Sequence, residues 1–100
     1  MINFAKTKKY KNGFKRGEHE TKPCYTLIPH KPLERLALHY TLGAKKYGKN
    51  NWKKAKGEDR EEFKDSAIRH VLAWAEGKKD ENHASAAIWN ILNYEYFEMD

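Results

Sequence analysis

The sequence has little that could cross-link the chain or anchor it in a membrane. Cys24 is its one cysteine, so an intrachain disulfide is excluded and a cysteine-based zinc site is not supported. No apolar run approaches the roughly 18 residues that a membrane-spanning helix requires. The segment Met1 to Lys11 lacks the apolar stretch of a signal peptide. We therefore expect an intracellular protein with no membrane partner.

Several signatures of phosphate chemistry and hydrolysis are also missing. The chain contains no glycine-rich P-loop, no Gly-x-Ser-x-Gly and no His-Glu-x-x-His. It does have an acidic cluster, at Glu58, Asp59, Glu61, Glu62 and Asp65. We expect these acids in the first turns of a helix, where negative charge favours the helix dipole, and we prefer this role to metal binding.

Positive charge is concentrated at the N-terminus. Residues 1–22 hold seven Lys or Arg and two acids, which gives them +5 of the net charge of +6. We predict a basic arm over 1–22 and a helical domain over 23–100. Such an arm indicates an anionic partner, with Arg16 and Lys22 as candidate phosphate contacts. A solvated tail is an equally good explanation.

Hydrophobic periodicity predicts a mainly α fold with three helices, at about 32–46, 59–76 and 80–97. Pro32 suits the first position of one helix, and Gly77 suits the end of the next. We expect residues 22–31 to be extended around their prolines and a short hairpin near 8–16. The expected apolar face of the third helix consists of Ala84, Ala87, Ile88, Ile91 and Leu92. A chain this small buries a thin core, so we also expect a homo-oligomer.

The second and third helices should form an antiparallel hairpin that brings polar residues together. Arg69 and Glu76 are seven residues apart, as are His83 and Asn90, so each pair shares a helix face. If the two helix faces meet, Glu76 lies beside His83 and Arg69 lies beside Asn90. Glu76 and His83 are then catalytic candidates, and Glu76 and Asp80 are candidate metal ligands. A buried hydrogen-bond network without chemistry is the alternative.

Further candidate ligand contacts are cations, an amide and aromatic rings near the helix ends. They are Lys45, Lys46, Tyr47, Asn51, Trp52, Arg69, His70, Trp74 and Asn90. An indole can stack on a base while Lys or Arg binds phosphate, Arg by its bidentate fork. The alternative for Trp52 is that it anchors its connection in the core.

Five stretches of the sequence, taken in order along the chain, resemble one phage-associated family, named for the N-terminal domain of dATP/dGTP diphosphohydrolases. The first two are Lys22-Pro23-x-Tyr25-x-Leu27-Ile28-Pro29 and Leu33-Glu34-x-Leu36-Ala37. The third is Gly43-Ala44-Lys45-Lys46-Tyr47-Gly48-x-x-Asn51-Trp52. The last two are Arg69-His70-x-Leu72-Ala73-Trp74-x-Glu76-Gly77 and His83-x-x-Ala86-Ala87-x-x-Asn90.

The resemblance implies purine deoxynucleotide handling in a phage-infected bacterial cytoplasm. By analogy with MazG-like all-α pyrophosphatases, it implies Mg²⁺ if the protein is catalytic and no cofactor otherwise. The sequence departs from the family at Lys78 and Lys79, where acids are usual, and at Ala86, where a second histidine is usual. Cys24 and Thr26 replace what is often Arg and Asp. These changes weaken the expectation of metal chemistry and favour phosphate binding.

Three hypotheses follow. The first is a nucleotide-binding protein that hydrolyses purine nucleoside triphosphates to monophosphate and pyrophosphate. The second is a non-catalytic protein that sequesters a nucleotide or cyclic-nucleotide-like immune signal of the host, an anti-defence role. The third is a nucleic-acid-binding protein that uses the basic arm, which ranks last because the helical part has no recognisable DNA-reading motif.

Overall fold

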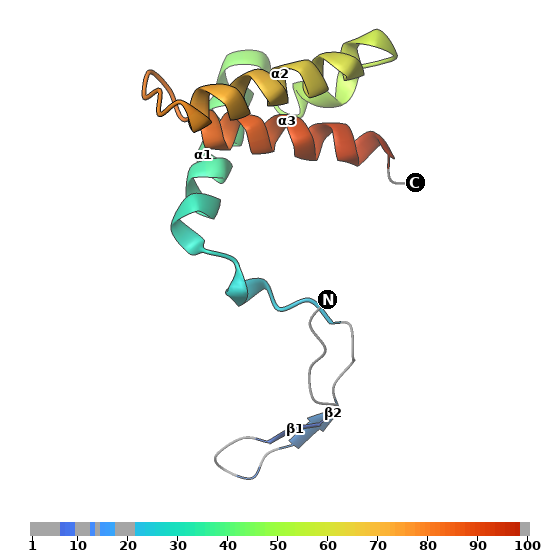
Figure 1. Cartoon of the computed structure of the whole chain (residues 1–100). Helices are drawn as coiled ribbons and strands as arrows, with labels where there is room; N and C mark the ends of the chain where they lie inside the picture. The colour runs from blue at the N-terminus through green and yellow to red at the C-terminus, as the bar shows by residue number, and fades with distance from the viewer. Residues whose placement is uncertain (1–6, 10–12, 14, 18–21, 99–100) are drawn as a thin grey trace.

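The fold is mainly helical, as the periodicity predicts (Figure 1). The computed structural model describes residues 7–9, 13, 15–17 and 22–98. Its elements are β1 (Thr7–Lys9), β2 (Lys15–Gly17), the 3₁₀ turn η1 (Tyr25–Leu27), α1 (His30–Tyr47), the 3₁₀ turn η2 (Asn51–Lys54), α2 (Glu58–Ala75) and α3 (His83–Glu98). Within these residues, no helix is both long and apolar enough to cross a bilayer.

The two short strands confirm the predicted hairpin. β1 and β2 pair antiparallel, with Thr7 opposite Gly17 and Lys9 opposite Lys15. Gly13, between them, has φ +83°, a backbone conformation that glycine adopts at little cost. The rest of the predicted turn, and the remainder of the basic arm up to residue 21, lies outside the described residues.

Helix α1 begins two residues earlier than Pro32. It starts at His30 with Pro29 at the N-cap, and Pro32 sits in the first turn, where its missing N–H has no helical partner in any case. The preceding segment is not fully extended as expected, because Tyr25–Leu27 forms a 3₁₀ turn. At the other end, Gly48 has φ +98° and closes the helix by donating its N–H to Ala44.

Helices α2 and α3 form the predicted hairpin, and their turn has a defined end-cap. Gly77 adopts φ +78°, and the N–H groups of Gly77 and Lys78 donate to the carbonyls of Trp74 and Ala73. This is the Schellman arrangement, which satisfies carbonyls at a helix end. Helix α3 starts at His83 rather than near residue 80. The cause is Asn82, whose side-chain oxygen accepts a hydrogen bond from the backbone N–H of Ser85 at 3.0 Å.

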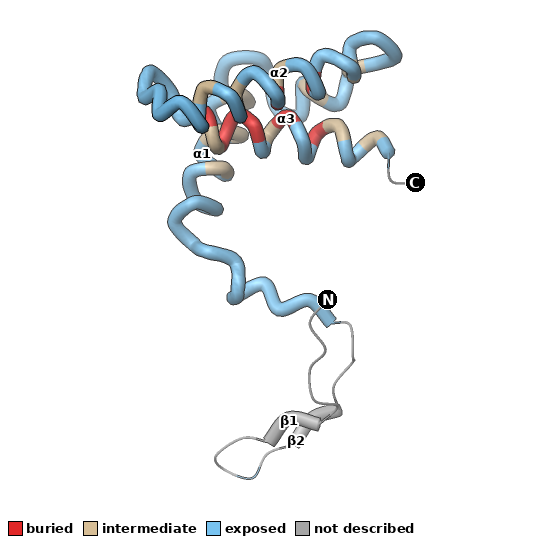
Figure 2. The backbone as a smooth tube through the Cα atoms, viewed as in Figure 1, coloured by how far each residue is buried: buried red, intermediate tan, exposed pale blue. Residues whose placement is uncertain are grey.

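The core lies between α2 and α3, and it is thin. Among the described residues, the buried apolar side chains are Phe63, Ala67, Ala86 and Ala87. Figure 2 shows the buried positions along α3 where it faces α2. Phe63 packs edge-on against Trp89, with ring centroids 5.8 Å apart, and stacks on Phe97 at 6.5 Å. These rings provide most of the large apolar surface inside the hairpin.

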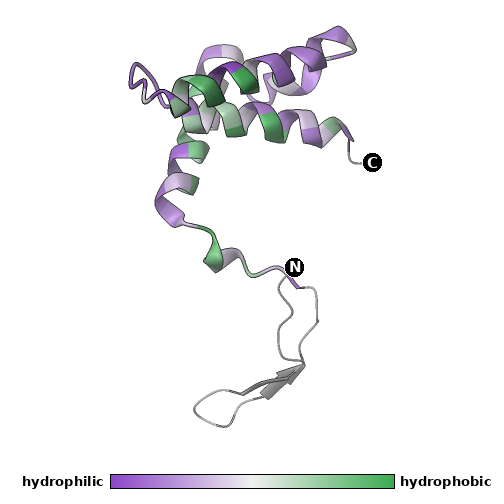
Figure 3. Ribbon diagram, viewed as in Figure 1, coloured by the Kyte–Doolittle hydropathy of each residue, from purple (hydrophilic) through white to green (hydrophobic). Residues whose placement is uncertain are grey.

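The predicted apolar face of α3 is wrong in part. Ala87 is buried, but Ile88, Ile91 and Leu92 are each more than two-fifths exposed. The face that packs inward carries mainly small and polar residues, namely His83, Ser85, Ala86, Ala87, Asn90 and Asn93. The reason is packing distance, since small side chains let two helices approach closely while bulky ones are left outside. In Figures 2 and 3 the last turns of α2 are likewise hydrophobic and largely exposed.

One hydrogen bond joins α1 to α3 through a buried amide. The Tyr40 hydroxyl donates to the side-chain oxygen of Asn93 at 2.7 Å, and Asn93 is fully buried. The amide nitrogen of Asn93 is buried too and has no hydrogen-bond partner among the described residues. Burial raises the pKa of Tyr40 above its usual value, so this phenol keeps its proton.

Candidate functional site

A groove of about 1130 Å³ lies where α1, η2, the start of α2 and the turn before α3 come together. Its volume exceeds that of most small-molecule sites, which measure roughly 300–1,000 Å³. Four cations line it: Arg35, Lys46, Lys49 and Lys54. Three acids line it as well: Asp59, Glu62 and Glu81. The groove is therefore large enough for a nucleotide and carries charges of both signs.

Aromatic rings form the apolar part of the groove. Trp52, on η2, is half-buried and packs edge-on against Tyr96 at 5.1 Å and Phe97 at 6.2 Å, both on α3. It also lies 6.4 Å from the ring of Tyr40. Trp52 thus anchors its connection, the alternative role given for it from the sequence, and it also contributes to the groove wall.

Tyr47 is the exposed aromatic residue of the groove. It is the last residue of α1, it is 61% exposed, and the ammonium of Lys46 lies 5.1 Å from its ring centroid. A cation over an aromatic face is an attractive arrangement. The pair therefore offers a flat ring and a positive charge side by side.

His39, on α1, forms another part of the lining, and its ring centroid lies 5.7 Å from that of Trp89. Burial lowers the pKa of His39 below its usual value; Glu81 opposes this shift and His70 adds to it. His39 is consequently a neutral imidazole at pH 7, able to donate or accept a hydrogen bond.

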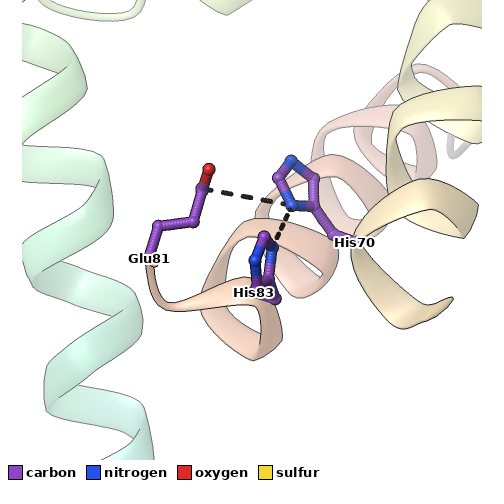
Figure 4. Close-up of side chains that lie close together, drawn as sticks. All are labelled: His70, Glu81 and His83. Carbon is purple, nitrogen blue, oxygen red and sulfur yellow. Dashed lines mark hydrogen bonds and ion pairs between the residues drawn. The ribbon is translucent and has the colours of Figure 1, made fainter. Parts of the chain in front are cut away.

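A cluster of three metal-ligating side chains stands at the turn between α2 and α3 (Figure 4). His70 comes from α2, Glu81 from the turn and His83 from the first residue of α3. The Nδ1 atoms of the two histidines are 2.9 Å apart, and Nδ1 of His70 is 4.0 Å from a carboxylate oxygen of Glu81. One donor atom from each of the three lies within 4.8 Å of the others.

Asp80 hydrogen-bonds to Nε2 of His83, the ring nitrogen that does not face His70. The Asp80 carboxylate is 2.7 Å from Nε2 of His83, and this hydrogen bond is the main reason that the pKa of Asp80 lies below its usual value. An ionised carboxylate only accepts, so Nε2 of His83 must carry the proton. The lone pair of a neutral His83 is then on Nδ1, the atom that faces His70 and Glu81.

The donor set fits a divalent metal ion. Two imidazole nitrogens and one carboxylate oxygen already converge, and a carboxylate on the outer nitrogen of a ligating histidine is the usual support for such a ligand. The set differs from the predicted ligands Glu76 and Asp80. Glu76 pairs with Lys78 at 3.7 Å and is not part of the cluster, whereas Asp80 supports His83 from behind.

The two side-chain pairs predicted between α2 and α3, Glu76 with His83 and Arg69 with Asn90, do not form. Asn90 donates its side-chain N–H to the carbonyl of Ala86 at 2.8 Å, and no hydrogen bond joins Asn90 to Arg69, both of which are described. His83 contacts His70 and Asp80 in place of Glu76. The polar pairs inferred from seven-residue spacing are therefore absent, and His83 and Asn90 hydrogen-bond to other residues.

The structure places the other predicted site residues in several different surroundings. Lys46, Tyr47, Asn51 and Trp52 line the groove, and His70 and His83 belong to the three-residue cluster. Lys22, Lys45, Arg69 and Trp74 are exposed outside both, and Asn90 is buried beside a separate apolar hollow on α2 and α3. Arg16 lies on β2, where side chains are outside the described residues.

Sequence reasoning missed Glu81 and His39. Glu81 lies two residues before His83, within reach of the same site, but the seven-residue spacing that selects Glu76 and His83 does not include it. His39 follows Leu36 by three residues and therefore shares the inward face of α1, a signal that the apolar pattern carried. Glu81 matters most, because it lines the groove and also belongs to the histidine cluster.

Residues 12–100 match the model of a family described as dATP/dGTP diphosphohydrolase, N-terminal. No curated protein and no solved structure matches the chain.

Proposed function

Because the chain belongs to the dATP/dGTP diphosphohydrolase N-terminal family, we propose that it binds a purine nucleoside triphosphate in the groove and cleaves it to monophosphate and pyrophosphate. One observation carries the proposal. Glu81 connects the groove to the His70 and His83 cluster, so a ligand in the groove would have its phosphates next to a place for a divalent cation.

The groove offers partners for both ends of a nucleotide. Lys46, Lys49 and Arg35 supply positive charge for the phosphates, and the exposed ring of Tyr47 can stack on a base. Base stacking on an aromatic side chain contributes roughly 1–3 kcal/mol and does not by itself select a base. The preference for purines is therefore inferred from the family name alone.

The chemistry requires a water molecule to attack the α-phosphorus. A bond forms between the water oxygen and phosphorus, and the bond from phosphorus to the α–β bridging oxygen breaks, releasing pyrophosphate. A bound divalent cation would supply charge neutralisation and a more acidic water. His39 lines the groove as a neutral imidazole and can accept the proton that the water loses.

The proposal is tested by incubating the protein with dATP, dGTP, dCTP and TTP in the presence of Mg²⁺, Mn²⁺ or Zn²⁺. We expect monophosphate and pyrophosphate from dATP and dGTP, separated and quantified by ion-exchange chromatography. The pyrimidine nucleotides are the matched controls. Intact dATP and dGTP with every cation, together with no heat of binding in calorimetry, would refute both binding and cleavage.

Sequestration without cleavage is the second candidate. Glu76, the acid at the end of α2, is paired with Lys78, so its charge is partly neutralised at the turn. The four cations that line the groove suit the holding of a phosphorylated ligand whether or not it is hydrolysed. Calorimetry with linear and cyclic nucleotides distinguishes the two candidates, because tight binding with full recovery of the ligand supports sequestration alone.

We further propose that the protein works as a homo-oligomer. Ile68, Leu72 and Ile91 are 47–59% exposed and line an apolar hollow of about 370 Å³ on the outer side of α2 and α3. Monomeric proteins seldom leave such contiguous apolar surface in water. We expect size-exclusion chromatography with light scattering to give a mass of at least two chains. Leu72→Lys should shift the mass toward that of one chain, and a monomeric wild-type protein would contradict the proposal.

A further inference from the structure

We propose that His70, Glu81 and His83 form a site for a transition-metal ion such as Zn²⁺ or Co²⁺ in preference to Mg²⁺. The site is the one used in the proposed function, but its metal preference rests on donor atoms alone. The inference rests on the proposed function only for what the ion does once it is bound.

The distances between the donors are close to those that one ion requires. Zinc binds imidazole nitrogen at roughly 2.0–2.1 Å in tetrahedral geometry, which puts two donors of one ion about 3.3 Å apart. The Nδ1 atoms of His70 and His83 are 2.9 Å apart, and the separation of His70 from Glu81 is 4.0 Å. The donor atoms of His83 and Glu81 lie within 4.8 Å of each other, so side-chain shifts of roughly 1–2 Å, mainly of the half-exposed Glu81, would complete the coordination.

The burial of the three ligands suits a site that opens on one side. His83 is buried at the start of α3, and His70 is about three-quarters buried on α2. Glu81 is half-exposed and faces the groove. Two ligands are therefore held by the helical hairpin, while the third leaves room for water or a phosphate oxygen. Three protein ligands with an open position are typical of catalytic zinc sites, whereas structural sites are closed by four.

The orientation of His83 is fixed before any ion binds. Asp80 accepts the Nε2 proton at 2.7 Å, which leaves Nδ1 of His83 as the free donor atom. His70 must then donate its own Nδ1 proton across the 2.9 Å gap, and this hydrogen bond holds the two rings in place. An ion that enters would take the place of that shared proton, and the proton would move to Nε2 of His70, so that both imidazoles stay neutral ligands.

The chemistry of the donors decides the kind of metal. Mg²⁺ is a hard ion that takes oxygen ligands and keeps much of its water. Imidazole nitrogen instead suits Zn²⁺, Cu²⁺, Ni²⁺ and Fe²⁺, and Co²⁺ lies between Fe²⁺ and Ni²⁺ in the order of affinities. Two of the three donors here are imidazoles, so the cluster would discriminate against Mg²⁺ even where Mg²⁺ is abundant.

The test is metal titration of the full chain after treatment with a chelator, without any nucleotide. We expect Co²⁺ to produce the visible absorption of a low-symmetry site and Zn²⁺ to displace it at one ion per chain. Calorimetry should give a Zn²⁺ affinity at least about a hundredfold above that of Mg²⁺. Comparable affinities for the two ions, or no cobalt band, would overturn the proposal.

Three variants and one control locate the ion. Glu81→Gln and His70→Gln should each weaken Zn²⁺ binding by more than about a hundredfold while keeping the circular dichroism spectrum of the wild type, and the half-exposed Glu81 is the safer position for the fold. Asp80 is a positioning residue, so Asp80→Asn should weaken binding by roughly 10–100-fold and leave the circular dichroism spectrum unchanged. His30→Gln, at the exposed start of α1, should have no effect. Equal binding by all four variants would refute the assignment.

These experiments test the metal site and the cleavage reaction separately, so either proposal can be refuted without the other. If the ion binds as expected but dATP and dGTP remain intact, the metal site stands and the proposed reaction is wrong. If cleavage occurs with Mg²⁺ while no transition metal binds the nucleotide-free protein, the reaction stands and the metal assignment is overturned.

Discussion

Replacing Glu81 by glutamine is expected to lower the rate of dATP and dGTP cleavage by about a hundredfold or more. The substitution keeps the shape of the side chain and removes the charge that faces both the groove and His70. Loss of one electrostatic partner of a transition state commonly costs this much, and loss of a metal ligand adds to it. The measurement is kcat and KM for pyrophosphate release.

The matched control is Glu61→Gln. Glu61 is exposed on the first turn of α2, and its recorded ion pair is with Lys64 at 3.8 Å. The control changes the net charge by the same amount at a place remote from the cluster, so its rate should stay within about twofold of the wild type. Equal losses in both variants would show that the effect is one of overall charge, and an unchanged rate in Glu81→Gln would remove Glu81 from the reaction.

Phe63→Ala should be the most destabilising single change in the helical hairpin. Phe63 is buried on α2 and packs against Trp89 and Phe97 of α3. A Phe→Ala change in a core costs about 3–5 kcal/mol, because apolar burial is lost and a cavity remains. For a domain of this size such a loss lowers Tm by roughly 12 °C or more.

Thermal unfolding followed by circular dichroism measures this effect. Tyr25→Ala is the control, because Tyr25 is 75% exposed and surface substitutions change stability by about 0.5 kcal/mol or less. A Tm for Phe63→Ala within a few degrees of the control would mean that the stability of the protein does not depend on the contact between α2 and α3.

The helical fold could be predicted because helix signals are local. Apolar spacing marked all three helices, and Gly77 marked the end of α2. The inward face of α3 could not be predicted in the same way. Hydrophobicity selects Ile88, Ile91 and Leu92 for burial, whereas the structure buries Ala86 and Asn90 beside α2 and leaves the larger residues outside. Close approach of two helices favours small residues, and that preference depends on the partner helix rather than on the residue itself.

The sequence indicates where the candidate metal cluster lies, at the turn between α2 and α3, but not which side chains form it. His70 and His83 are separated by 13 residues, and the capped turn between them decides which side chains meet. Spacing along one helix predicts which residues share a face, but it says nothing of the rotation that a turn adds. Glu76 was therefore expected beside His83, and the structure gives that place to His70 and Asp80.

The bond between Tyr40 and Asn93 has a consequence for the groove. The edge-on aromatic contacts of Trp52 hold η2 against α1 and α3. A hydrogen bond of 2.7 Å has a fixed reach and direction. The hydrogen bond therefore fixes the position of α1 along α3 at Tyr40, a residue that lines the groove, from a point inside the protein.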